Sequence, residues 1–233
     1  MSASASATPT RSPESWLTFA SAGLARVPLT ITLTLFAALL STSPEAALAA
    51  EFDRAALQCG QLWRVSTGHF VHWNVDHLLW DLAAFFVLGA YCEARGRRSY
   101  AICLLLASLT ISAGVWWFLP DLQTYRGLSG LDSALFVLAA GRFAVDARRQ
   151  GDAAAAWFAY AALIGFLLKI AYETATGATL FVDSAAADFV PLPLSHLLGG
   201  LAGAGVVLWL NGRRSDLGRN LAAVHGRSQE PTS

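Results

Sequence analysis

The stretch "YRGLSGLDSALFVLAAG" (residues 125–141) is a mostly apolar run with a serine between two glycines and an aspartate three residues further on. Inside lipid, polar side chains such as Ser129 and Asp132 are costly and usually serve a function. The whole chain has a membrane composition, since 55% of its 233 residues are apolar and 14% are charged. A soluble domain has about 25% charged residues. We therefore expect lipid to be the main solvent of this protein.

Six apolar segments approach the roughly 20 residues that a helix needs to cross a bilayer. They are residues 24–43, 76–93, 99–119, 128–145, 153–172 and 193–211. The sequence thus predicts an all-α membrane protein with a six-transmembrane-helix bundle over residues 24–211. The polar ends, residues 1–23 and 212–233, contain few apolar side chains, and we expect both to be disordered.

The first segment has a second interpretation. Its apolar core is short, and Ala47-Leu48-Ala49 resembles a signal-peptidase site. Cleavage there would leave five helices and would not change the topology of the rest.

Arginines are distributed unevenly between the two sides of the predicted bundle. With the N-terminus in the cytoplasm, twelve arginines fall on the inside and three, Arg54, Arg64 and Arg126, on the outside. Because cytoplasmic loops are enriched in Lys and Arg, we expect both termini to be cytoplasmic and Ser129 to lie near the outer face. A net charge of +0 gives no indication of nucleic acid as a partner.

Few strongly polar side chains fall inside the predicted spans, and such residues are functional candidates. They are His77, Asp81, Ser129, Asp132, Lys169, Glu173 and His196. By the predicted topology, His77, Ser129 and His196 share the outer half of the bilayer, as one common site would require.

Ser129 stands at the expected start of a helix, in the sequence "GLSG". Backbone amides at a helix N-terminus lack partners within the helix and suit a developing oxyanion. Alternatively, small residues in a membrane helix simply allow close packing.

His196 is followed by Gly199 and Gly203 in "SHLLGGLAGAG" (residues 195–205). Glycines four residues apart on one face let two helix backbones approach closely. If this helix packs on the one that starts at Ser129, His196 can act as the general base of that serine.

Three histidines lie close together in residues 69–77, and two of them, His69 and His72, fall in a predicted loop. His77 and Asp81 are one helical turn apart. No familiar zinc spacing is present, so we expect no metal site and no cofactor. The three cysteines, Cys59, Cys92 and Cys103, match neither a disulfide framework nor a zinc motif.

Taken in order, these motifs resemble the rhomboid family of intramembrane serine proteases. The matching residues are Trp63-Arg64, His72, His77, "EARG" (93–96), "GLSG" (127–130) and His196-x-x-Gly199. Within that family the chain is most similar to the rhombosortases, a bacterial branch paired with proteins that end in a GlyGly-type sorting tail. The first outer loop, "YRGLSG", and "LLKIAYE" with Lys169 and Glu173 fit this branch.

The resemblance implies a Ser–His dyad without a third acid, with Ser129 as nucleophile and His196 as base. It also implies an oxyanion hole formed by the Ser129 amide, His77 and the residue at position 81. His72, Asp132, Lys169 and Glu173 are possible supporting residues. Arg64 is expected to anchor its loop rather than to catalyse.

The chain departs from the family pattern at two positions. Asp81 stands where the family usually has an asparagine that donates to the oxyanion, and it could donate only when protonated. Ser133 stands where a ring commonly supports the catalytic histidine. Asp132 beside it either orients His196 or faces another helix and stays neutral. Lys169 and Glu173 either neutralise each other or face the substrate.

The sequence therefore predicts a protease of a bacterial inner membrane whose active site opens to the periplasm. Its expected partners are membrane-anchored proteins with a C-terminal transmembrane sorting tail. Two alternatives belong to other classes. One is a catalytically impaired rhomboid-like protein that binds membrane segments as a chaperone or sorting factor. The other is a small transporter, which is disfavoured because no internal repeat is apparent.

Overall fold

The computed structural model describes residues 23–177 and 192–227. Helices dominate, and apart from the C-terminal end of α10 their ends lie within a few residues of the predicted spans. The elements are α2 (Pro28–Leu40), α3 (Pro44–Ala50), β1 (Phe52–Asp53), α4 (Arg54–Gln58), α5 (Arg64–Thr67), the 3₁₀ helix η1 (Gly68–Phe70), α6 (Val75–Arg95), α7 (Arg97–Phe118), β2 (Thr124–Tyr125), α8 (Ser129–Arg149), α9 (Ala153–Thr176) and α10 (Pro193–Arg227).

Four of the described helices, α6, α7, α9 and residues 193–213 of α10, are long and apolar enough to cross a membrane. A fifth span is possible if α2 and α3, which meet at a bend of 118°, form one broken span. The protein is therefore a multi-pass membrane protein. The prediction of six spans is not confirmed. α2 is short and meets α3 at a sharp bend, and α8 is less apolar than the four helices named above.

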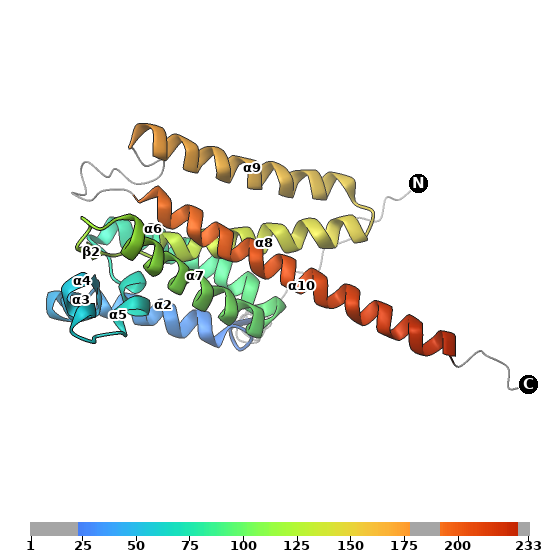
Figure 1. Cartoon of the computed structure of the whole chain (residues 1–233), viewed down its shortest axis with the longest axis horizontal. Helices are drawn as coiled ribbons and strands as arrows, with labels where there is room; N and C mark the ends of the chain where they lie inside the picture. Colours follow the sequence, from blue (N-terminus) through green and yellow to red (C-terminus); the bar gives the residue numbers. More distant parts are fainter. Residues whose placement is uncertain (1–22, 178–191, 228–233) are drawn as a thin grey trace, which may run out of the picture.

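α8 lies at the centre of the bundle, where it packs against α6, α7, α9 and α10 (Figure 1). Protein rather than lipid covers most of its surface, and Leu131, Leu135 and Leu138 are fully buried. A helix enclosed in this way needs less apolar surface of its own, which accounts for its lower hydropathy.

The N-termini of α6, α8 and α10 and the C-terminus of α9 come together at one end of the bundle (Figure 1). The predicted site residues lie on these helix ends and on the loop before α6, and they are therefore gathered at one end of the bundle.

The chain between α3 and α6 forms a compact cap beside that end of the bundle. β1 pairs antiparallel with β2, with Phe52 opposite Tyr125. The Arg64 guanidinium is buried and donates to the carbonyl oxygens of Leu48 and Glu51, each at 2.8 Å. Arg64 thus holds the loop by its backbone, as the sequence predicts.

The expected disorder of residues 1–23 and 212–233 stays a prediction. Residues 1–22 and 228–233 lie outside the described residues. α10 continues past the expected boundary at residue 212 and ends at Arg227.

Candidate active site

Ser129 is the first residue of α8 and is half-buried. No side chain caps this helix start. The first-turn amides therefore point out of the helix end, next to the serine hydroxyl. Gly127, two residues earlier, has a φ of +129°. This backbone conformation is accessible to glycine and strained for other residues, so Gly127 sets the turn that leads into Ser129.

A set of loop contacts holds the turn before Ser129. Tyr125 is buried and donates its hydroxyl to the Gly127 carbonyl oxygen at 3.2 Å. Burial raises the pKa of the Tyr125 hydroxyl, so it stays protonated as a donor. Arg126 forms an ion pair with Glu51 at 2.8 Å and stacks over the Trp73 ring at 4.4 Å. The sequence interpretation missed Tyr125 and Glu51, although the opposite charges of Arg126 and Glu51 were a visible signal.

α10 reaches the start of α8 through the predicted glycine stripe. A methyl group at Gly199 would overlap the Gly130 carbonyl oxygen, and one at Gly203 would overlap the Ala134 carbonyl oxygen. A methyl group at Gly130 would lie 3.2 Å from the Ser195 carbonyl oxygen. The backbones at residues 130 and 195 are therefore in close contact, and Ser129 and His196 are the residues next to that contact.

Hydrogen bonds to His196 come from α9. Its Nδ1 lies 2.9 Å from the Glu173 carboxylate and 3.3 Å from the Lys169 ammonium. Lys169 and Glu173 pair at 2.7 Å. In the described part of the chain, no hydrogen bond joins His196 to the Ser129 hydroxyl or to Asp132. Asp132 is buried on α8, and its Oδ1 has no partner among the described residues.

His72, His77 and Asp81 form a second cluster beside Gly127. The Asp81 Oδ2 atom lies 3.3 Å from Nε2 of both imidazoles. A side chain at position 127 would meet the His77 ring at 3.2 Å. All three side chains are buried. A carboxylate between two imidazoles is placed to accept their hydrogen bonds, so this geometry makes Asp81 an acceptor.

His69 is separate from that cluster. Its Nε2 lies 3.2 Å from both the Ser108 carbonyl oxygen and the Ser112 hydroxyl on α7. Burial lowers its pKa to about 4. His69 is therefore a neutral residue that fastens the loop to α7.

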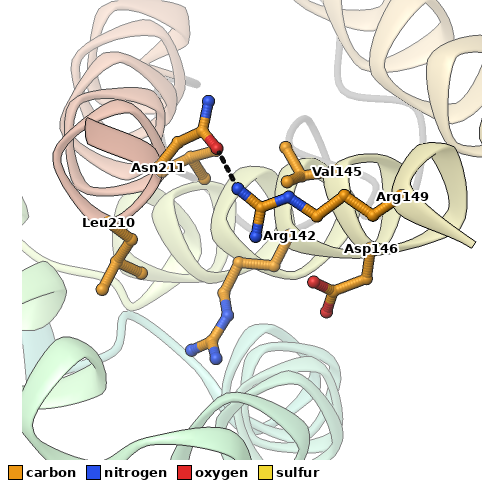
Figure 2. A pocket seen from close by; sticks show the side chains of 7 residues that line it. Arg142, Val145, Asp146, Arg149, Leu210 and Asn211 are labelled. Carbon is orange, nitrogen blue, oxygen red and sulfur yellow. Dashed lines mark hydrogen bonds between the residues drawn. The ribbon is translucent and has the colours of Figure 1, made fainter. Parts of the chain in front are cut away.

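A surface hollow at the opposite end of α8 is unrelated to this site. Figure 2 shows Arg142, Asp146 and Arg149 around it, with Arg149 bonded to Asn211 on α10 at 2.7 Å. These residues lie at the end of α8 far from Ser129 (Figure 1). The hollow is a gap between side chains of α8 and α10 where these two helices pack together.

Comparison with protein families matches residues 59–214 to the Rhomboid domain. No curated protein matches the chain. The matched region covers more than half of the chain and contains α6 to α9 and the part of α10 up to residue 214, with Ser129, His196, His77 and Asp81. The chain therefore belongs to the rhomboid family, whose members are in general intramembrane serine proteases.

Proposed function

We propose that this protein is an active intramembrane serine protease in which Ser129 is the nucleophile and His196 is the general base. The observation that carries this proposal is the contact between Gly130 and Ser195, together with the Gly199 contact to the Gly130 carbonyl oxygen. This close approach brings together the start of α8 and the start of α10. The Ser–His pair needs that proximity for proton transfer.

In the proposed reaction, the Ser129 hydroxyl oxygen attacks the scissile carbonyl carbon and its proton passes to His196 Nε2. The carbonyl oxygen becomes an oxyanion, which the Ser129 amide and a donor from the His77–Asp81 cluster would stabilise. His196 then gives the proton to the leaving amine as the C–N bond breaks. Water repeats the attack on the acyl enzyme, with His196 again taking its proton and returning it to Ser129.

The proposed substrates are partner proteins with a C-terminal transmembrane tail of the GlyGly sorting type. We place the protein in a bacterial inner membrane, with both termini cytoplasmic and the active site open to the periplasm. Support for these finer points comes from the arginine distribution and from the sequence resemblance to the rhombosortases.

A fluorophosphonate probe and a membrane-anchored reporter with such a tail test the proposal together. The probe should label the wild type but not Ser129→Ala. Ser129→Ala and His196→Ala should each abolish cleavage, and the double variant should be no worse, because the pair acts as a unit. Reporter cleavage by Ser129→Ala would disprove the nucleophile. A reporter whose two glycines are replaced by leucines should resist cleavage by the wild type.

The second candidate is a catalytically impaired protein that binds membrane segments. It is favoured by the acceptor role of Asp81 at a position where the family usually has a donor. A folded wild type that neither reacts with the probe nor cleaves the reporter, but binds it, would identify this function.

A further inference from the structure

His196 is connected to a charged pair that the Ser–His scheme leaves unexplained. Glu173, near the end of α9, is 1% exposed, and its carboxylate contacts both Lys169 and His196. A buried carboxylate in a membrane helix is costly unless it is paired and hydrogen-bonded. Its partners here are one cation and one imidazole of the proposed site.

The chemistry of the three groups decides which of them shares a hydrogen with His196 Nδ1. A carboxylate only accepts hydrogen bonds and an ammonium only donates them. The single Nδ1 atom therefore cannot bond to both at once. Glu173 is closer, at 2.9 Å against 3.3 Å for Lys169. Lys169 already donates to Glu173 at 2.8 Å and pairs with its other oxygen at 2.7 Å. The geometry thus favours an Nδ1–H bond from His196 to Glu173.

We infer that Glu173 is a positioning residue that makes the site a Ser129–His196–Glu173 triad. The inference rests on the proposed function. With its hydrogen on Nδ1, His196 has a lone pair on Nε2, which is the atom that must take the Ser129 proton. Glu173 keeps the ring in this tautomer and offsets the charge of the imidazolium that forms, while Lys169 neutralises Glu173 between turnovers. The family resemblance, in contrast, implies a dyad without an acid.

The polar side chains of Asp132 and Ser133, close to Ser129 on α8, do not replace Glu173 as a hydrogen-bond partner of His196. Asp132, on α8, has no hydrogen bond to His196 among the described residues. Ser133 donates to the Ser129 carbonyl oxygen at 2.8 Å. Within residues 23–177 and 192–227, the titratable groups hydrogen-bonded to His196 are Glu173 and Lys169, both on α9. The alternative is structural, with the Lys169–Glu173 pair only fastening α9 to α10.

Glu173→Ala with formate separates these two roles. Removal of the carboxylate should lower kcat by at least about tenfold, because loss of the orienting acid in a serine-protease triad costs up to about 10⁴-fold. KM should stay unchanged. Formate can enter the space left by the side chain, pair with Lys169 and accept from Nδ1, so it should restore part of kcat. Glu173→Gln, which keeps the size but not the charge, should also lower kcat without unfolding the protein.

Glu93→Ala is the matched control, because Glu93 is another buried glutamate, 2% exposed, with a cationic partner one turn away. It bonds to the backbone at Leu29 and Thr30, far from His196. The amount of folded Glu93→Ala protein should fall, but kcat per folded molecule should hold and formate should have no effect.

Two outcomes would overturn the inference while leaving the proposed protease intact. They are full kcat in Glu173→Ala, and a loss of kcat in Glu173→Ala that formate does not relieve. Failure of the proposed function itself looks different, because the wild type would then escape the fluorophosphonate probe.

Discussion

Gly199 of α10 lies directly against the backbone carbonyl oxygen of Gly130 of α8, with no room for a methyl group between them. This contact joins the helix that begins at Ser129 to the helix that carries His196. We therefore expect this backbone contact to set the distance between Ser129 and His196.

Gly199→Ala should therefore push α10 away from α8 and abolish or strongly reduce cleavage. Overpacking of this kind costs about 1–3 kcal/mol of stability. Gly205→Ala is the control, because a methyl group at Gly205 on the same helix meets nothing within 4 Å. Reporter cleavage and unfolding in detergent measure both variants. Equal activity of the two would show that the contact does not set the Ser129–His196 geometry.

Asp81→Asn should preserve or raise activity. The asparagine oxygen can still accept from His72 and His77, and its amide adds a donor near the expected oxyanion, where one donor is worth about 3–4 kcal/mol. Asp81→Leu should lose activity, because it leaves two buried imidazoles without their acceptor. Cleavage rates of the three proteins test this. An inactive asparagine variant beside an active wild type would give the carboxylate itself a required role.

Cysteine labelling in intact cells should reveal the orientation. Cys59 is exposed, whereas Cys92 and Cys103 are buried, so a membrane-impermeant maleimide has one accessible native target. By the arginine distribution, Cys59 should react from the periplasm. A cysteine introduced by Arg148→Cys in a Cys59→Ser background should be protected until the cells are permeabilised. The reverse pattern would invert the topology.

His69 should make stability depend on pH in mildly acidic solution. Its pKa is about 4 in the folded protein and near 6.5 when the chain is unfolded. Between these values the unfolded state binds a proton that the folded state does not, so stability falls as pH drops from 6.5 to 4. The full effect is on the order of 3 kcal/mol.

His69→Gln removes the titrating group and should flatten that part of the profile. Urea unfolding of both proteins in micelles between pH 7 and pH 4 measures the difference. Parallel profiles would show that His69 is not buried as a neutral ring.

Much of this protein follows from local sequence. Apolar runs and short arginine-rich connectors predict where helices lie, because a bilayer requires long apolar segments whose backbone bonds are internal. Gly199 and Gly203 are spaced four residues apart, which predicts that their helix packs closely against another helix just after His196. The structure confirms this contact. The first and fourth predicted spans are not confirmed, since α2 is short and meets α3 at a bend of 118°, and α8 is shielded from lipid by its neighbours.

Only the tertiary structure decided which polar groups meet. Sequence places Asp132 three residues from Ser129 and Glu173 more than twenty residues from His196, yet Glu173 is the carboxylate that contacts the imidazole. In the same way, His72 and His77 share Asp81, and Tyr125 and Glu51 hold the turn before Ser129. The physical reason is that periodicity predicts the depth of a side chain in the membrane, whereas the rotation of each helix and its choice of neighbours depend on the packing of segments distant in sequence.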